Sequence, residues 1–375
     1  MKKKTLAIIG ASYLQRPLVE KANEMGLRTI CFAWAEGAVC KDICDVFYPV
    51  SIIEKEEILC ICREEQIDGI CTVASDVAAP TVAYVAQQMG LNGNAYEAAV
   101  KANNKFAMRN AFMAAGVPCP KYVSVNDASQ LSSLTSHLSF PVIVKPTDRS
   151  GSLGITKVTN EEELCEAVKI AVNHSFEHEA LVEEFIEGRE ISVEFISYKG
   201  THYPLQITDK VTTEAPHFVE LAHHQPSNLP AEMQERIYAI TRQALDALGL
   251  TDGASHSEYK ITAEGRIAVM EIGGRMGGDF IGSNLVQLST GYDFLQGVIE
   301  VALGSFQPPK KTIRRFAGVY FLTADTQNVK HYIDHAADYP EIVAAEQTDK
   351  ELRHVSCSAE RSGYFIYQAD RKFEI

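Results

Sequence analysis

The stretch PVIVKPTDRSGSLGI, from Pro141 to Ile155, joins an apolar strand to a loop of glycine and serine, and Lys145 ends the strand. Glycines cost backbone entropy, so a loop this poor in side chains needs a reason to leave its backbone bare. The usual reason is an anion held by successive backbone N–H groups, to which a lysine adds a point charge. We therefore predict a phosphate-binding loop over residues 150–154, although the Walker A pattern G-x-x-x-x-G-K-[ST] is absent.

Composition limits the classes of function that the chain can have. Its 375 residues are too many for one ordinary core and predict two or three domains. A formal charge of −14 argues against an extended nucleic-acid surface and against an anionic membrane as partner. Nine cysteines without paired zinc-type spacing or a signal peptide predict a reduced, cytoplasmic protein. No run approaches the roughly 18 apolar residues of a membrane span.

The first hundred residues alternate between strand and helix patterns. Strands are predicted at Leu6 to Gly10, Arg28 to Trp34 and Asp68 to Ser75, with helical segments between them. This alternation predicts a parallel α/β domain over residues 1–100. Its first loop, GASYLQRP, lacks G-x-G-x-x-G, so dinucleotide binding is the weaker interpretation. The stronger one is a scaffold whose strand ends line a pocket that another domain completes.

From Lys101 onward the pattern changes to helices mixed with antiparallel strands. Helices are predicted at Lys101 to Ala115, near Glu161 to Asn173 and at Glu232 to Leu248. A linker is predicted at Gly304 to Lys311 because of its glycine, prolines and lysines. The prediction is therefore a central module over residues 101–305, with a smaller subdomain at about 118–186, and a strand-rich domain over 310–375.

A hairpin near residue 264 brings two carboxylates together. If Glu264–Gly265 forms the tight turn, residues whose numbers sum to 529 face each other, which places Glu258 opposite Glu271. Opposed like charges destabilise a strand pair, so a cation is expected between them, and hard oxygen ligands suit Mg²⁺. The alternative is two solvated glutamates on an exposed face. The glycine-rich turn GGRMGGDF directly after Glu271 favours a pocket.

Three further residues stay open on the sequence alone. The segment HFVELAHHQPSN contains Glu220 and His223, and Pro226 excludes a helical metal motif there. Lys210 lies in the strand pattern that precedes it. An active-site role and a structural role are equally consistent with each of these side chains.

Taken together, these motifs resemble the ATP-grasp enzymes of the carboxylate–amine ligase type, which are related to the ATP-grasp domains of carbamoyl-phosphate synthase and biotin carboxylase. The resemblance runs from about Lys101 to Gly304. It rests on NNKFAMRNAFMAAGVPCPKY, FPVIVKPTDRSGSLGI, ALVEEFIEGREISVE, EYK and MEIGGRMGGDFI. It implies a Rossmann-like pre-ATP-grasp domain, an ATP-grasp module of two α+β subdomains with residues 118–186 as the lid, and a small C-terminal domain.

The resemblance also implies a role for individual residues. The ATP phosphates would be held by Lys105 and Lys145, under a loop containing Ser150, Gly151, Ser152 and Gly154. The adenine hinge, largely through its backbone, would be Glu183, Glu184, Phe185 and Ile186. The ribose would be bound by Glu190. The ligands of Mg²⁺, or of Mn²⁺ in its place, would be Glu258 and Glu271. The catalytic side chains would be Arg275 and Lys145.

One departure from the family pattern concerns the metal site. The family commonly has asparagine two positions after the second glutamate, where this chain has Gly273, so one expected ligand is missing. Members that join amino acids are similar here, which favours amino-acid-like substrates.

The function implied by the resemblance is ligation of a small carboxylate to an amine through an acyl phosphate, with release of ADP and phosphate. The expected partners are these small molecules, and a homodimer is left open. The alternatives are a bicarbonate-activating enzyme and a non-catalytic nucleotide-binding module.

Overall fold

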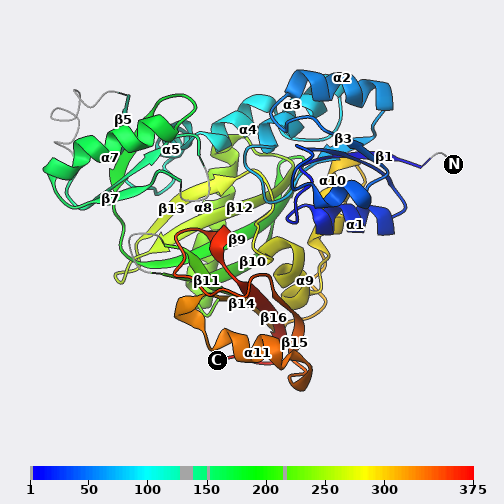
Figure 1. Ribbon diagram of the computed structural model, residues 1–375. Coiled ribbons are helices and arrows are strands. Elements are labelled where there is room, and N and C mark those ends of the chain that lie inside the picture. Colours follow the sequence, from blue (N-terminus) through cyan, green and yellow to red (C-terminus); the bar gives the residue numbers. More distant parts are fainter. Residues whose placement is uncertain (1–2, 127–137, 150–152, 214–217) are drawn as a thin grey trace.

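The computed structural model describes residues 3–126, 138–149, 153–213 and 218–375, and it contains three β-sheets within a mixed α/β architecture. Figure 1 shows two lobes, one from the N-terminal residues and one around α7, set above a large central sheet. The C-terminal strands lie at the opposite end of that sheet from the lobes. The predicted fold class is confirmed.

The N-terminal lobe is a parallel sheet with helices packed around it, as the alternating pattern predicts. In spatial order its strands are β3 (Val46–Tyr48), β2 (Arg28–Phe32), β1 (Thr5–Ile9) and β4 (Gly69–Cys71). The helices of this stretch are α1 (Arg16–Glu24), α2 (Lys55–Glu65) and α3 (Ala79–Met89). Parallel strands place their carboxyl ends along one edge, which is where a ligand site forms in open α/β sheets.

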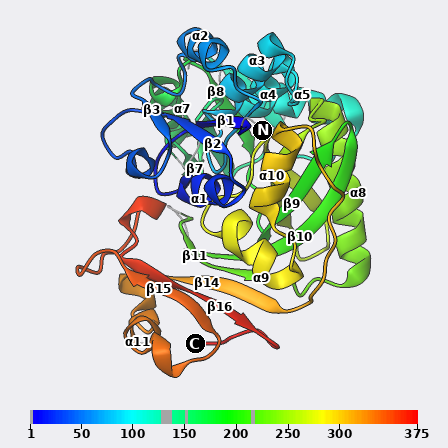
Figure 2. The same ribbon diagram turned by 90° about the vertical axis from the view of Figure 1, so that its right-hand side faces the viewer.

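A helix from far along the chain completes this lobe. Helix α10 (Phe294–Ala302) shares one hydrophobic core with α1 and the first sheet, and Figure 2 shows it beside α1. Gly69 permits this approach, because a Cβ there would lie 2.9 Å from the Ala302 carbonyl oxygen. The first hundred residues therefore do not build the lobe's core alone. Helix α10 contributes to it, although its residues fall within the predicted central module 101–305.

Within its described residues, the second lobe is a small antiparallel sheet covered by helix α7 (Glu161–His174). Its strands, in spatial order, are β5 (Tyr122–Val125), β8 (Ala180–Glu184), β6 (Val142–Pro146) and β7 (Thr156–Val158). Helix α7 (Glu161–His174) packs Leu164 and Val168 against Val144 and Val182. The Asn160 side chain caps α7 by accepting a hydrogen bond from the Glu163 N–H.

The central sheet has eight antiparallel strands. In spatial order they are β13 (Ile267–Gly273), β12 (Gly253–Ile261), β9 (Arg189–Tyr198), β10 (Thr201–Thr212), β11 (Glu220–Gln225), β14 (Phe316–Leu322), β16 (Gly363–Ala369) and β15 (Ile342–Gln347). The helices around it are α4 (Tyr96–Asn103), α5 (Lys105–Ala115), α8 (Ala231–Leu248), α9 (Val286–Thr290) and α11 (Val329–Asp334). Helices α5 and α8 share a core with β9, β12 and β13.

The C-terminal strands continue this sheet. Residues 310–375 are strand-rich, as predicted, but β14 pairs with β11 through partners such as Ala222 and Tyr320, so β14, β16 and β15 extend the central module. Among the described residues, none of the helices combines the length and apolar character that crossing a membrane requires.

The junction between β11 and the C-terminal strands contains a buried histidine with a predicted effect on acid stability. His224 is 2% exposed, and its Nδ1 lies 3.0 Å from the Tyr367 hydroxyl. Burial lowers the pKa of His224 to about 3. The unfolded chain, with a histidine pKa of about 6.5, therefore binds a proton in this range that the folded chain does not.

We expect His224 to reduce the free energy of unfolding as pH falls from about 6.5 toward 3, by at most about 1.4 kcal/mol per pH unit. His224→Gln should flatten this acid branch in urea titrations at pH 7, 6 and 5. His331→Gln, at an exposed position, is the matched control and should keep the wild-type slope. An unchanged slope in His224→Gln would contradict the assignment.

Candidate active site

A cavity of about 360 Å³ lies where the N-terminal lobe, the small sheet and the central sheet meet. Tyr13 and Leu14 reach it from the loop after β1, and Ala74 and Asp76 from the loop after β4. The prediction that the N-terminal strand ends line a shared pocket is thus confirmed. The charged and histidine side chains of the wall are Asp76, Lys105, Arg149, Lys210, Glu220, His223, His256, Glu258, Glu271, Arg275 and Asp279.

The hairpin places Glu258 opposite Glu271, as predicted, and both line the cavity. The route to this register differs from the expectation. Nearer the turn, Lys260 pairs with Ala268, and the register shifts between Glu258 and Tyr259. The shift acts as a β-bulge, because one extra residue on β13 changes the register by one and brings Glu271 opposite Glu258. Bulges of this kind are frequent beside active sites.

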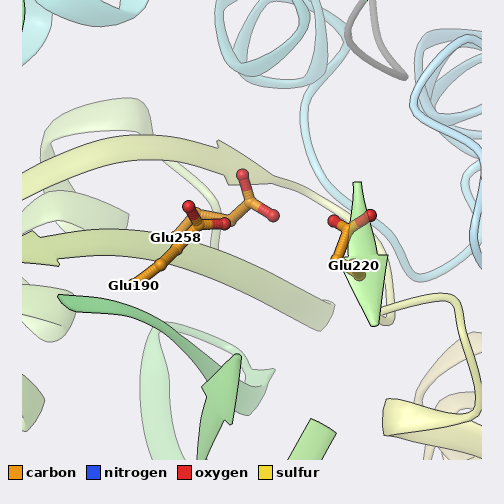
Figure 3. Close-up of side chains that lie close together, drawn as sticks. All are labelled: Glu190, Glu220 and Glu258. Atoms are coloured by element: carbon orange, nitrogen blue, oxygen red, sulfur yellow. The ribbon is translucent and has the colours of Figure 1, made fainter. Parts of the chain in front are cut away.

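Lys210, left open by the sequence, lies at the centre of an acidic cluster. Its buried ammonium is 2.7 Å from Glu258, 2.9 Å from Glu190 and 3.2 Å from Glu220. Figure 3 shows the three glutamates, which come from three strands: Glu190 from β9, Glu220 from β11 and Glu258 from β12. Burial alone would lower the pKa of Lys210, but the carboxylates outweigh it and hold that pKa well above its usual value.

The same three carboxylates are a candidate metal group, since they offer oxygen atoms within 4.8 Å of one another. Only Glu258 of the two predicted ligands belongs to it. Glu190, which the resemblance assigns to the ribose, also pairs with Lys260 at 2.9 Å. The Lys210 ammonium therefore contacts the same carboxylate oxygens of Glu190, Glu220 and Glu258 that could ligate a divalent cation.

Lys105 links the second predicted ligand to the loop after β6. Its Nζ lies 3.0 Å from Glu271 Oε1 and donates to the Arg149 carbonyl oxygen at 2.6 Å. The helix predicted over 101–115 is divided at Asn104, whose side chain caps α5 by accepting from the Ala107 N–H. The break places Lys105 at the first position of α5, facing the cavity.

The side chain of Glu183 lies in a buried cluster with two cations. It is 1% exposed, accepts from Arg109 Nη2 at 2.9 Å and forms an ion pair with Lys145. Lys145, although described, lies outside the wall of the cavity. Burial lowers the pKa of Lys145, whereas Arg109 and Lys145 together hold the pKa of Glu183 low despite its burial. Only the backbone of Glu183 remains for the predicted hinge.

The structure gives contacts for the other three residues of the predicted hinge. Glu184 pairs with Arg266 through both carboxylate oxygens, at 2.6 and 2.9 Å. Phe185 lies under the Lys157 ammonium and Ile186 is buried. Their roles toward a nucleotide stay predictions.

The predicted phosphate loop is described only from residue 153, so Ser150, Gly151 and Ser152 lie outside the described residues. Gly154 has φ +73°, which favours glycine, and a Cβ there would meet Pro146 Cγ at 3.0 Å.

Arg275 lies on the cavity wall, and its partner was not anticipated. Its Nε and Nη2 donate to the two oxygens of Asp76 at 2.8 and 2.7 Å. One bidentate edge of the guanidinium is therefore occupied by the N-terminal lobe. Nη1 makes a long contact of 3.4 Å with the Met276 carbonyl oxygen, and its second N–H can reach a ligand. The available signal for Asp76 was its position just after a strand of the parallel sheet.

The buried His256 contacts the carboxylate of Glu258. His256 Nδ1 bonds to the fully buried Glu194, and its Nε2 lies 3.4 Å from Glu258 Oε1. Burial would lower the pKa of His256, but Glu194 and Glu258 raise it to about 9. The Gly277 N–H also donates to Glu194, at 3.1 Å. Sequence reasoning missed this pair, although the alternating polar residues His256, Glu258 and Lys260 were an available signal.

A second cavity of about 640 Å³ adjoins the first and extends toward the C-terminal strands. The two share wall residues, among them Tyr13, Ala74 and Asp279. At their junction Arg361 forms a bidentate pair with Asp279, at 2.6 and 2.9 Å. His223 is 1% exposed, its Nε2 is 3.9 Å from Asp279, and neither ring nitrogen has a hydrogen-bond partner among the described residues.

The chain is similar to known proteins in sequence. Residues 138–283 match the model of the ATP-grasp domain family. The alanine–anticapsin ligase of Bacillus subtilis is 27% identical over 294 residues, which cover 70% of this chain and 62% of that protein. The D-alanine–D-alanine ligase of Geobacter sulfurreducens is 29% identical over 197 residues, 51% of this chain and 61% of that enzyme. The chain thus spans about three-fifths of the length of these relatives.

Solved structures share the whole fold. An L-amino acid ligase from Bacillus licheniformis superposes with a TM-score of 0.81 at 23% identity, covering 99% of this chain and 94% of that one. The ADP complex of an N5-carboxyaminoimidazole synthetase from Staphylococcus aureus gives 0.79 at 16% identity, covering 99% and 95%. At such identities the likeness speaks for the fold alone.

Proposed function

From the match of residues 138–283 to the ATP-grasp domain family, we propose that the chain is an ATP-dependent carboxylate–amine ligase acting on amino-acid-like substrates. The observation that carries the proposal is the cavity in which Glu258 and Glu271 face each other among Lys105, Lys210 and Arg275. Alternating carboxylates and cations suit a nucleotide triphosphate with its counter-ion and a second anionic substrate.

In the first step, an oxygen of the substrate carboxylate attacks the γ-phosphorus of ATP. The bond from that phosphorus to the bridging oxygen breaks, ADP leaves with the electron pair, and an acyl phosphate remains. Lys105, at the start of α5, neutralises phosphate charge from the lid side. Arg275 meets the carboxylate through the N–H of Nη1 that does not face the Met276 carbonyl oxygen. Catalysis of this kind rests on positioning and charge neutralisation and needs no protein nucleophile.

In the second step, the nitrogen lone pair of the amine attacks the acyl carbon. The bond from that carbon to the phosphate oxygen breaks, phosphate leaves, and the nitrogen loses a proton. The adjoining 640 Å³ cavity gives the amine a route to the acyl phosphate, past Asp279 and then His223, whose ring nitrogens have no hydrogen-bond partner among the described residues. Aromatic side chains of its wall, such as Phe280 and Tyr364, suit an organic amine better than a small inorganic anion.

The donor set fits a magnesium ion. Carboxylate oxygens of Glu258 and Glu271 would hold it, with Glu190 and Glu220 close to Glu258. When bound, Mg²⁺ would neutralise charge on the phosphate oxygens. Lys210 and His256 orient Glu258 by hydrogen bonds at 2.7 and 3.4 Å. Gly273 offers no side-chain ligand at the position where the family commonly has asparagine.

We expect the protein to release ADP and phosphate, and no AMP or pyrophosphate, when ATP and Mg²⁺ are supplied with an amino acid and a second amino acid as amine. The reason is that the cavity's cations and acidic groups suit attack at the outer phosphate. The measurement is a coupled ADP assay across single amino acids and pairs, with mass spectrometry of the amide product.

The same assay separates the alternatives. ADP release that depends on bicarbonate and no organic acid would replace the ligase by a bicarbonate-activating enzyme. ATP binding without ADP release under any combination would leave a nucleotide-binding module. Release of AMP would reject the proposed attack on the γ-phosphorus.

A further inference from the structure

We propose that Asp76 is a positioning residue for Arg275, and that Gly273 is the residue that makes room for it. This inference rests on the proposed function, because Arg275 is assigned there to the reacting carboxylate. It gives the N-terminal lobe a part in the chemistry beyond lining the cavity.

The contact between the two side chains is close and specific. Both oxygens of Asp76 accept from Arg275, at 2.8 Å from Nε and 2.7 Å from Nη2. The two side chains are only 14% and 15% exposed, so solvent screens the pair little. A planar guanidinium held along one edge has its other edge fixed in direction, which a single-point contact would not achieve.

Gly273 explains how a carboxylate from another lobe reaches this position. A Cβ at residue 273 would lie 2.5 Å from Asp76 Oδ1, and 3.1 Å from Arg275 Nε. Any side chain there would therefore displace the pair. The carboxylate of Asp76 therefore occupies the space that the side chain of the family's asparagine would need.

The loop that carries Asp76 is itself fixed to the turn that carries Arg275. The Ala74 N–H donates to the Met276 carbonyl oxygen at 3.1 Å. Ala74 has φ +56°, a left-handed conformation that is costly for a residue with a Cβ. A Cβ at Gly278 would lie only 3.4 Å from the Ala74 Cβ. Strained backbone of this kind persists where surrounding structure holds it, and it is common at functional sites.

A purely structural ion pair between the two lobes is the competing interpretation. It predicts that losing Asp76 lowers stability and leaves turnover per folded molecule unchanged. The positioning role predicts a loss of kcat with little change in ATP affinity, because the guanidinium loses its direction and not its charge. A misplacement of about 1 Å can cost about a hundredfold in rate.

The test is a double-mutant cycle in the full-length protein with Asp76→Asn, Arg275→Lys and both together. We expect Asp76→Asn to lower kcat by about tenfold to a hundredfold, with the Kd for ATP changed less than about threefold. The double variant should be no slower than Arg275→Lys alone, because Asp76 acts only through Arg275. Multiplicative losses in the double variant would overturn the proposal.

Gly273→Ala provides a second route to the same result, since its methyl group would displace Asp76. It should reproduce the loss in Asp76→Asn. The matched control is the adjacent Gly274→Ala, whose Cβ would meet only the flexible Leu250 side chain, at 3.2 Å. It should keep kcat within about threefold of wild type. Equal losses in the two alanine variants would reject the role given to Gly273.

A measurement without substrate keeps this test independent of the ligase assignment. Phenylglyoxal labelling of Arg275, mapped by mass spectrometry, should be several-fold faster in Asp76→Asn and Gly273→Ala than in wild type or Gly274→Ala. Faster labelling without any ADP release from wild type would support the positioning of Arg275 by Asp76 and reject the proposed function. Equal labelling rates in all four proteins would reject the positioning of Arg275 by Asp76.

Discussion

Arg275→Lys is expected to lower turnover by about a hundredfold to a thousandfold while the Kd for ATP stays within about threefold. Lysine retains the charge but cannot hold both oxygens of Asp76 and present a further N–H to the substrate, as the guanidinium does. A charged hydrogen bond lost in the transition state costs about 2.7–4 kcal/mol, which corresponds to this loss of rate.

The measurement is kcat from ADP release beside ATP affinity from calorimetry in the same variant. Arg353→Lys is the matched control, because Arg353 is an exposed arginine that pairs with Asp349 and Glu351 near the C-terminal strands. It should behave as wild type in both measurements. If ATP affinity fell as far as kcat in Arg275→Lys, Arg275 would be a nucleotide ligand and its proposed role toward the substrate carboxylate would be wrong.

Glu183→Ala is expected to destabilise the protein by about 3–5 kcal/mol, because it leaves two buried cations without their carboxylate. Arg109 and Lys145 both contact Glu183, and all three side chains are at most 8% exposed. The loss should appear in urea-induced unfolding and should be independent of nucleotide.

The adjacent glutamate gives a matched control for this loss. Glu184 pairs with Arg266 at the surface, where the two side chains are 27% and 46% exposed. Glu184→Ala should therefore cost no more than about 1 kcal/mol, the usual range of exposed ion pairs. Equal destabilisation by the two variants would show that burial does not separate them, and would contradict the structural role given to Glu183.

The sequence by itself determined the features that depend on local pattern. Alternating strands and helices predicted the parallel N-terminal sheet, because the spacing of apolar residues that distinguishes a strand from a helix can be recognised within a few residues. The pairing of Glu258 with Glu271 followed from one hairpin, whose strands are neighbours in the chain. The glycine-rich turn directly after Glu271 indicated a pocket, and the family resemblance assigned Arg275, which lies on the cavity wall.

Tertiary structure decided the contacts that join distant segments. Asp76 and Arg275 are separated by 199 positions, and Arg109 and Glu183 by 74. No local period records such a partner, so Glu183 could not be distinguished from Glu184, although one side chain points into a buried cluster and the other to the surface. The union of the C-terminal strands with the central sheet is of the same kind, because strand neighbours far apart in the chain are chosen by edge hydrogen bonding and core packing.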